Sequence, residues 1–435
     1  MERKLMKELV NWKNDKNRKP LILRGARQVG KTWLLKEFGK QYYKNVAYFN
    51  LDYETNLSEF FKTTKDVNRI IEQLTFINKD AINKNTTLII FDEIQECPEA
   101  LNTLKYFCEN EPEYHVACAG SLLGVRMAKS SFPVGKVDFL DVFPLTFTEF
   151  LKANSCDNLI SYINSIDKIE KIPDIFFNQL EEKLKAYMII GGMPEAVKIW
   201  VEEKDVNKVE KIQNAILDAY DSDFSKHTSV HEANKINLIW KSIPSQLAKD
   251  NKKFLYQVVK EGARAREYED ALNWLDNANI VHKIYKAKEN NLPLNGYDDL
   301  SAFKIYYNDV GLLSRQSRLD SKVFAEGKQI FKEFKGALTE NYVLQMLLAT
   351  LIDKPKYFTF DRYEIDFLLQ LKNEIIPIEV KSSENDNNTS FNKYNEIYNP
   401  KLRIRFSTNN LSYDGNVLNI PLFMVEFFKQ LINLL

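Results

Sequence analysis

The residues with the clearest chemistry lie near the start of the chain, where two glycines frame a loop that ends in a lysine and a threonine. The segment Gly25-Ala26-Arg27-Gln28-Val29-Gly30-Lys31-Thr32 has the spacing GxxxxGK[ST], in which loop N–H groups wrap the phosphates of a nucleotide. Lys31 would reach the β- and γ-phosphates, and the Thr32 hydroxyl would bind Mg²⁺. The motif follows a short apolar run and opens a helix, so it predicts ATP and Mg²⁺ as cofactors, with Trp33 also at the nucleotide. The alternative is a glycine turn with an incidental lysine.

Two carboxylates follow the apolar run Leu88-Ile89-Ile90-Phe91. A fully apolar run of this length is typical of a buried strand in a parallel sheet. Asp92 would then hold the magnesium shell, and Glu93 would polarise the attacking water. The alternative is a strand that ends in a solvated acidic turn.

Three further residues are weaker candidates near this site. Ser121 follows the strand expected at His115 to Ala119, where a polar side chain can sense the γ-phosphate; the alternative is a capping serine. Asn50 ends another expected strand and would restrain Glu93, although asparagine there is also a turn former. Arg126 would act on the nucleotide of a neighbouring subunit, or Arg27 would contact the nucleotide instead; the alternative is that both are ordinary exposed arginines.

A second cluster lies near the C-terminus, on two expected strands. Asp366 is on the first strand, and Glu379 and Lys381 are on the second, two residues apart and therefore on one face. Two carboxylates and a lysine suit phosphodiester hydrolysis with Mg²⁺ or Mn²⁺, in which Lys381 steadies the developing negative charge. Glu340, on a preceding helix, would complete the metal shell. The alternatives are charged residues on a solvent face, or a fold kept for binding.

The composition limits the other possibilities. The 435 residues carry 60 basic and 60 acidic side chains, so a strong overall attraction to nucleic acid is not indicated, although a local basic face is allowed. The four cysteines lack CxxC spacing, which argues against a zinc site and a disulfide framework. We find neither an apolar signal segment nor an apolar run near the ~18 residues that span a bilayer. We therefore expect no membrane association and a cytoplasmic location.

The order of expected elements predicts four domains. Strands alternate with helices over 1–145, which predicts a parallel α/β sheet covered on both faces. Residues 146–228 are expected to be helical and to form a lid. Three helices and a strand pair over 229–318 have the outline of a winged helix. A long helix followed by strands over 319–435 predicts a second, smaller α/β domain.

The phosphate-binding loop, the acidic residues Asp92 and Glu93, and the sheet that carries them resemble the AAA+ group of P-loop ATPases. That resemblance implies the sheet order 5-1-4-3-2 and a helical lid. The segment Gly191-Gly192-Met193-Pro194 is similar to a lid motif of the archaeal and signal-transduction ATPases, which implies that Pro194 lies near the nucleotide. The alternative is a simple helix break.

The order helix-Glu340, strand-Asp366, strand-Glu379-x-Lys381 looks like the PD-(D/E)xK nuclease fold, a restriction-endonuclease-like α/β fold. Over nearly its whole length, the chain is similar to a bacterial and archaeal family that joins an AAA+-type ATPase to a C-terminal domain of unknown function. The further segments that carry this resemblance are Ala119-Gly120-Ser121-Leu122-Leu123-Gly124, Phe143-Pro144-Leu145-Thr146-Phe147, Ile243-Pro244-Ser245-Gln246-Leu247 and Tyr306-Tyr307-Asn308-Asp309-Val310-Gly311-Leu312-Leu313.

Two functional hypotheses follow. The first is an ATP-driven switch or motor acting on DNA, with a metal-dependent nuclease-like domain; Arg264 and Arg266, at the start of the third middle helix, would contact DNA. ATP would then control the nuclease face or the assembly of a homo-oligomer. The second is an ATP-dependent regulatory scaffold, whose nuclease-like fold is inert and serves binding. An obstructed face around Glu379 and Lys381 would favour the second hypothesis.

Overall fold

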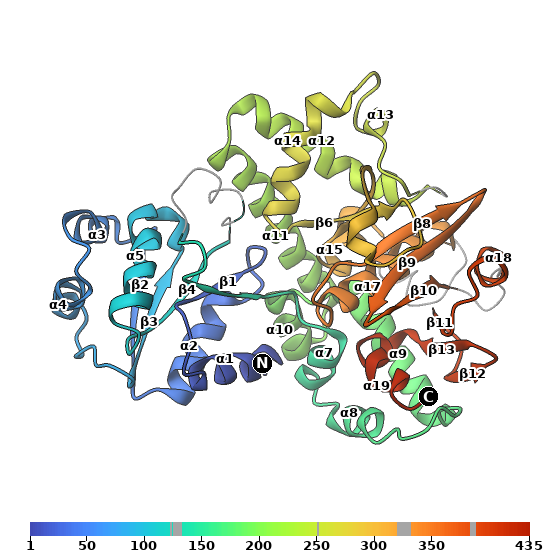
Figure 1. The fold of residues 1–435 in the computed structure, drawn as a ribbon, viewed down its shortest axis with the longest axis horizontal. Coiled ribbons are helices and arrows are strands. Elements are labelled where there is room, and N and C mark those ends of the chain that lie inside the picture. Colours follow the sequence, from blue (N-terminus) through green and yellow to red (C-terminus); the bar gives the residue numbers. More distant parts are fainter. Residues whose placement is uncertain (122–123, 125–132, 250–251, 320–331, 383–388) are drawn as a thin grey trace. The chain divides into compact units, whose positions relative to one another are not determined.

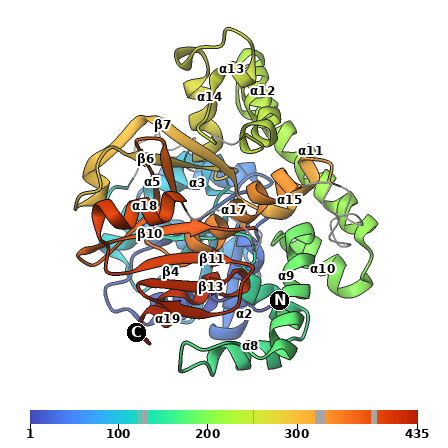
Figure 2. The same ribbon diagram turned by 90° about the vertical axis from the view of Figure 1, so that its right-hand side faces the viewer.

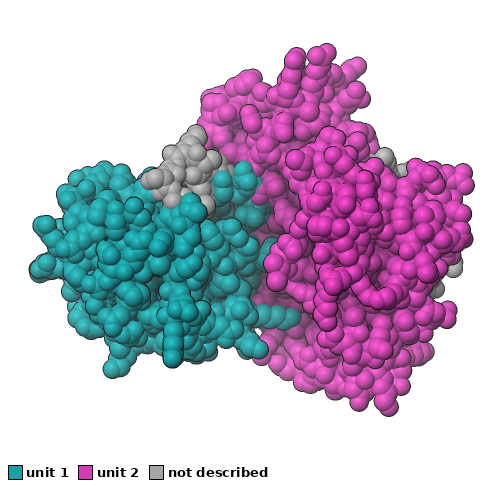
Figure 3. All heavy atoms as spheres, viewed as in Figure 1, with its two compact units in different colours: residues 1–143, 277–280 teal, residues 144–276, 281–435 magenta. Residues whose placement is uncertain are grey.

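The computed structural model describes residues 1–121, 124, 133–249, 252–319, 332–382 and 389–435. These residues form two compact units, drawn in different colours in Figure 3. Unit 1 contains residues 1–143 and 277–280, and unit 2 contains residues 144–276 and 281–435.

Unit 1 is built on a five-stranded sheet with the order β2-β3-β4-β1-β5, and every neighbouring pair is parallel (Figure 1). The expected parallel α/β sheet is therefore confirmed, and its order is the one that the AAA+ resemblance implies. The strands are β1 (Leu21–Arg24), β2 (Asn45–Asn50), β3 (Thr87–Asp92), β4 (His115–Ala119) and β5 (Asp138–Asp141). The helices are α1 (Leu5–Asn14), α2 (Lys31–Tyr42), α3 (Ser58–Thr63), α4 (Val67–Ile77) and α5 (Pro98–Asn110), with short 3₁₀ turns η1 (Thr55–Leu57) and η2 (Ile94–Glu96).

Helices cover both faces of this sheet. Helix α2 packs against β2, β3 and β4, and α1 packs on α2. On the other face, apolar side chains of the sheet form one core with α3, α4 and α5. All six residues of β3 are buried, as its apolar sequence predicts for a strand covered on both sides. The sheet is therefore a rigid base for the loops at the carboxyl ends of its strands.

Unit 2 begins with helices and ends with a large mixed sheet. The first helices are α7 (Phe147–Ala153), α8 (Asp157–Asn164), α9 (Asp174–Ile190), α10 (Pro194–Glu203), α11 (Val206–His227), α12 (Val230–Leu247), α13 (Tyr256–Val259) and α14 (Ala265–Asn277). Later helical elements are η4 (Leu294–Tyr297), α15 (Val310–Gln316), α17 (Lys332–Leu348), α18 (Thr389–Tyr398), η6 (Leu422–Phe427) and α19 (Phe428–Ile432). The strands are β6 (Val281–Ala287), β7 (Asp298–Tyr307), β8 (Lys356–Phe360), β9 (Tyr363–Leu371), β10 (Glu374–Val380), β11 (Arg403–Ser407), β12 (Ser412–Asp414) and β13 (Val417–Pro421).

The strand pair expected in the winged helix belongs to the same sheet as the C-terminal strands. The sheet has eight strands in the order β12-β13-β11-β10-β9-β8-β6-β7, several of which are seen one beside the next in Figure 2. Strand β6 pairs in parallel with β8, through Lys286 with Tyr357 and Ala287 with Phe358. Three helices and a ribbon occur in the expected sequence order, but the ribbon extends the C-terminal sheet instead of standing alone as a wing.

Two glycines at the end of α9 allow backbone to pack around a buried carboxylate. Gly191 has a φ of 73°, and a Cβ at this position would lie 2.1 Å from Asp309 Oδ1. Asp309 is fully buried and accepts hydrogen bonds from Gly192 N at 2.6 Å and Leu312 N at 3.0 Å. Burial raises the pKa of Asp309 to about 6, although these hydrogen bonds act in the opposite direction. Within unit 2, the Gly191-Gly192 segment therefore serves the packing of α9 against α15.

The raised pKa of Asp309 predicts a pH-dependent contribution to stability. Its folded pKa is about 6 and the ordinary value is 3.8, so its stabilising contribution is fully present below 3.8 and is lost as the pH rises through 6. Between pH 5 and pH 8, the unfolding free energy of the native protein should fall by roughly 1.4 kcal/mol relative to Asp309→Asn, which cannot titrate. Thermal unfolding followed by circular dichroism at several pH values measures this difference. Asp414→Asn, at an exposed position, is the control; a constant difference between native protein and Asp309→Asn would contradict the prediction.

Candidate functional site

The phosphate-binding loop joins β1 to α2 through strained glycine positions. Gly25 has a φ of 145°, and a Cβ there would lie 2.2 Å from the carbonyl oxygen of Val142. Gly30 has a φ of 91° and precedes the first residue of α2. Since side chains other than glycine rarely adopt these conformations, the two glycines fix the course of the loop. The loop N–H groups and the amino end of α2 then form the kind of site that binds phosphates.

The side chain of Lys31 is buried at the base of this loop. Its Nζ donates hydrogen bonds to the carbonyl oxygens of Gly25 at 2.9 Å and Ala26 at 2.7 Å. Burial lowers the pKa of Lys31 to about 8, although the nearby carboxylates of Glu93 and Asp92 raise it. An ammonium group removed from water interacts strongly with added negative charge, so Lys31 is suited to bind a phosphate.

Thr32 and Asp92 lie together, as expected for residues that share a magnesium ion. The Thr32 hydroxyl donates a hydrogen bond of 3.0 Å to Asp92 Oδ1. Asp92 Oδ2 accepts a hydrogen bond of 2.7 Å from the hydroxyl of Tyr48, on the neighbouring strand β2. A hydroxyl and a carboxylate are oxygen ligands of the kind that Mg²⁺ takes beside nucleotide phosphates, so these residues fit the ion.

Glu93 and Ser121 are also brought together. The Ser121 hydroxyl donates to Glu93 Oε2 at 3.3 Å, and Gln95 Nε2 donates to the same oxygen at 2.5 Å. Glu93 has a φ of 50°, which turns the chain sharply after β3. Asn50 instead accepts hydrogen bonds from the backbone N–H groups of Asp52 and Tyr53, so its side chain forms a turn. Gln95, in η2, and Ser121, which follows β4, therefore hold the carboxylate that we expect to polarise water.

The remaining residues predicted for the nucleotide are placed as follows. Arg27, Gln28 and Val29 lie in the loop between Gly25 and Gly30, and Trp33 is on α2 with a 44% exposed side chain. Arg126 lies outside the described residues. Pro194 is the first residue of α10 in unit 2, and its proximity to the nucleotide stays a prediction.

Tyr48 and Gln95 are site residues that the sequence did not identify. A tyrosine two residues before the end of an alternating strand normally signals packing, and no motif marks it. Its position on the same side of β2 as Asn50 is the one available signal, because residues two apart on a strand share a face.

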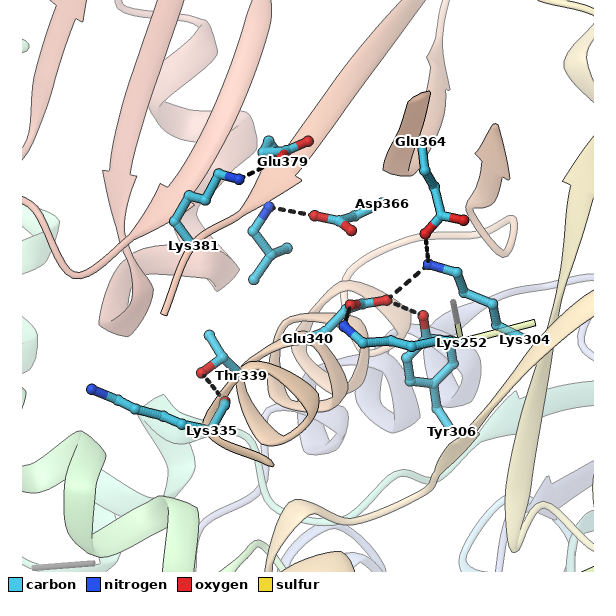
Figure 4. Close-up of polar contacts among 11 residues, drawn as sticks. Lys252, Lys304, Tyr306, Lys335, Thr339, Glu340, Glu364, Asp366, Glu379 and Lys381 are labelled. Atoms are coloured by element: carbon cyan, nitrogen blue, oxygen red, sulfur yellow. Dashed lines mark hydrogen bonds and ion pairs between the residues drawn. The ribbon is translucent and has the colours of Figure 1, made fainter. Parts of the chain in front are cut away.

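The C-terminal residues lie on α17, β9 and β10, all within unit 2 (Figure 4). Asp366 Oδ2 accepts a hydrogen bond of 2.8 Å from the backbone N–H of Val380, which fixes the carboxylate of β9 against β10. Burial, and then the charges of Glu340 and Glu379, raise the pKa of Asp366 well above its ordinary value. The three carboxylates thus act on one another electrostatically.

Glu379 and Lys381 form an ion pair that uses one of the two carboxylate oxygens of Glu379. Lys381 Nζ lies 2.7 Å from Glu379 Oε1. Glu379 is 6% exposed, and its Oε2 is buried without a hydrogen-bond partner. Burial raises the pKa of Glu379 even though Lys381 lowers it. A buried carboxylate oxygen without a donor is costly unless a cation or water satisfies it, so this position fits a metal ligand.

Glu340, the third predicted ligand, is surrounded by donors from the middle of the chain. Its Oε2 forms an ion pair with Lys252 Nζ, and its Oε1 accepts from Lys304 Nζ at 3.2 Å and from the hydroxyl of Tyr306. Lys304 also lies 2.6 Å from Glu364 Oε1. Burial alone would raise the pKa of Glu340, but the two lysines lower it below the ordinary value. Among the described residues, no group of three or more His, Cys, Asp or Glu side chains is arranged to hold a metal ion.

Three ranges of the chain match known families. Residues 17–151 match the family described as AAA domain, and this range contains the phosphate-binding loop, Asp92, Glu93 and Ser121. Residues 181–323 match "Domain of unknown function (DUF8612)" and residues 335–423 match "Domain of unknown function (DUF4143)". No curated protein matches the sequence. The chain therefore contains an AAA-type ATPase domain, which supports ATP binding and hydrolysis.

Solved structures give more distant likenesses. The Walker-type ATPase PABY2304 of Pyrococcus abyssi is 13% identical over 72% of this chain and 95% of that chain, with a TM-score of 0.45. The Aeropyrum pernix ORC1 protein in complex with DNA is 14% identical over 72% and 90%, with a TM-score of 0.29. The Thermotoga maritima RuvB Holliday junction branch migration motor is 11% identical over 68% and 91%, with a TM-score of 0.31. We draw no functional conclusion from them, since all three TM-scores are below 0.5.

In the parts of the chain that the structure describes, none of the helices combines the length and the hydropathy needed to cross a bilayer.

The ATP site makes a first prediction. Lys31→Ala should abolish tight ATP binding because the buried ammonium is lost, whereas Glu93→Gln should keep binding and reduce hydrolysis about 100-fold or more. Binding of a fluorescent ATP analogue and release of phosphate measure the two effects. Lys40→Ala, an exposed change on the same helix, should alter neither. Unchanged turnover in the Lys31 or Glu93 variant would contradict the assignment of the site.

Tyr48 makes a second prediction, specific to the metal. Tyr48→Phe removes the hydrogen bond to Asp92 Oδ2 but keeps the ring, so the Mg²⁺ concentration that gives half-maximal ATP hydrolysis should rise about tenfold. ATP binding without Mg²⁺ should not change. Tyr53→Phe, at a position 87% exposed, serves as the control. A Mg²⁺ dependence equal to that of the native protein would show that Tyr48 does not position Asp92.

Proposed function

We propose that the chain is an ATP-hydrolysing switch that controls a metal-dependent, nuclease-like site acting on DNA. The metal-dependent site in this proposal depends on one observation. The buried Glu379 Oε2, which lies near Asp366 and Lys381, has no hydrogen-bond partner. Such an oxygen is suited to a bound cation.

The order of elements around this oxygen supports the proposal. Helix α17 is followed by β8, β9 and β10, which pair antiparallel in succession, and then by α18 and β11, which pairs in parallel with β10. This order of elements supports the proposal of a nuclease-like fold, which the order of Glu340, Asp366 and Glu379-x-Lys381 suggested. It brings Asp366 and Glu379 to adjacent strands.

The chain's own groups have distinct roles in this proposal. At the ATP site, Thr32 and Asp92 would hold Mg²⁺, Lys31 would neutralise the phosphates, and Glu93 would orient the attacking water. At the C-terminal site, Asp366 and Glu379 would hold Mg²⁺ or Mn²⁺, which would activate water and stabilise charge on the phosphodiester. Lys381, held by Glu379, would steady the negative charge that develops on the phosphate.

DNA as the substrate is supported by two exposed arginines. Arg264 and Arg266 lie at the start of α14 and both side chains are exposed. Arginines at the start of a helix suit contacts to phosphates and base edges. Formation of a homo-oligomer in the ATP-bound state is part of the same proposal.

One observation favours the alternative, a regulatory scaffold with an inert nuclease-like fold. Both oxygens of Glu340 are engaged by lysines, which obstructs one side of the carboxylate group that would bind metal. In this alternative, ATP would still control the conformation, but the C-terminal region would bind its partner without cutting it.

Cleavage of DNA separates the two functions. The native chain, incubated with linear and circular DNA and Mg²⁺ or Mn²⁺, should cut DNA, and ATP should change the rate. Glu379→Gln and Lys381→Ala should each lower cleavage at least about 100-fold because they remove a metal ligand and a cation. Glu374→Gln, on the same strand and paired with Lys401, is the matched control.

The outcomes of this assay are distinct. Cleavage that survives Glu379→Gln and Lys381→Ala would show that the site is misplaced. Absence of cleavage with either metal, with and without ATP, would favour the scaffold.

A further inference from the structure

The carboxylate of Glu340 has little capacity left for a metal ion. Its Oε1 accepts hydrogen bonds from the ammonium of Lys304 and the hydroxyl of Tyr306, and its Oε2 forms an ion pair with the ammonium of Lys252. Figure 4 shows Asp366 between this group and the pair formed by Glu379 and Lys381. A metal ion at Glu340 would have to compete with its buried ammonium partners.

Lys304 is a permanent part of the cluster. Its side chain has no exposed surface, and its ammonium lies between the carboxylates of Glu340 and Glu364. These charges raise the pKa of Lys304 well above its ordinary value against the opposing effect of burial, so the ammonium stays charged. Lys252 is the outer member of the pair, with 17% of its side chain exposed.

One buried oxygen of the cluster leaves room for one small cation. Four carboxylates are accompanied by three ammonium groups and by the guanidinium of Arg405, whose charge acts on Glu379, yet the buried Glu379 Oε2 has no hydrogen-bond partner. One divalent ion on this oxygen would satisfy it, whereas a second divalent ion would add positive charge to a cluster that is already balanced. The carboxylates are those of Glu340, Glu364, Asp366 and Glu379, and the ammonium groups are those of Lys252, Lys304 and Lys381.

We propose that Lys252 and Lys304 take the place of a second metal ion, so that the C-terminal site binds a single divalent cation on Asp366 and Glu379. Glu340 is then an anchor for the two lysines and not a metal ligand. This inference rests on the proposed function, since it assumes that the C-terminal site binds a divalent metal.

The inference makes the middle of the chain part of the C-terminal site. Lys304 is carried by β7, at the edge of the eight-stranded sheet, and Lys252 precedes α13. Both are positioning residues: they would hold the charge and geometry around the metal without touching the reacting atoms. A single Mg²⁺ held by Asp366 and Glu379 would supply a water molecule activated for attack on the phosphodiester.

Counting bound Mn²⁺ tests this proposal directly. Free Mn²⁺ is measured by electron paramagnetic resonance during titration of the full-length chain without nucleotide. The native chain should bind one Mn²⁺, and Glu379→Gln should bind none. Lys252→Met keeps the length of the side chain and removes one charge, so it should bind two Mn²⁺, with the first bound about tenfold more tightly. The double variant Lys252→Met, Glu340→Gln should return to one. Lys249→Met, at an exposed position, is the control and should match the native chain.

Each alternative result has a definite meaning. Two Mn²⁺ in the native chain, or one in Lys252→Met, would overturn the role of the lysines. Absence of Mn²⁺ binding from the native chain and from every variant would instead overturn the proposed metal site. Circular dichroism of each variant verifies that the fold is retained.

Discussion

A carboxylate taken out of water needs hydrogen bonds or positive charge around it, and much of unit 2 is arranged by this need. Glu340 is 2% exposed, and its charge is balanced by Lys252 and Lys304. Lys304 reaches it from β7, which joins the C-terminal strands through the pairing of β6 with β8. Asp309 meets the same need without a cation, through backbone N–H groups that the glycines near it allow to approach. The cost of buried charge thus determines which segments must lie together.

The buried charges of the ATP site are stabilised in a different way. Lys31 is buried and is held by carbonyl oxygens of its own loop, so its charge is stabilised without an ion pair. Asp92 and Glu93 are held by neutral donors, Tyr48 and Ser121 among them. Neutral donors orient a carboxylate without cancelling its charge, which leaves it able to attract a cation or to polarise water. The C-terminal cluster, where lysines cancel most of the charge, has a much smaller capacity for added cations.

Much of unit 1 could be predicted because its signals are local. The apolar run that ends at Phe91 and the expected strand that ends at Ala119 marked β3 and β4, and the glycine-rich motif marked the start of α2. The placement of Lys31, Thr32 and Asp92 around one point follows from the parallel sheet, since the carboxyl ends of its strands share an edge.

The partners of Glu340 could not be predicted, because they come from distant segments. Lys252 is 88 residues away, in a stretch that resembles ordinary solvated charge, and Lys304 is 36 residues away, within the apolar and aromatic sequence of β7. The pairing of β6 with β8 involves only two residue pairs, and β7, α15 and α17 lie between these strands in the sequence. No periodicity in the sequence therefore predicts this pairing. Strand β12 was also missed, since its three residues are all exposed.

The continuity of the eight-stranded sheet has a consequence for how this region can be exchanged between proteins. A segment containing only the C-terminal strands would expose the edge of β8 where β6 normally pairs, and an unpaired edge invites association with other chains. It would also carry Glu340 without the two lysines that neutralise it. Recombination that preserves a folded product must therefore transfer the hairpin of β6 and β7 together with the C-terminal strands. The two sequence regions would then be exchanged between proteins as one unit.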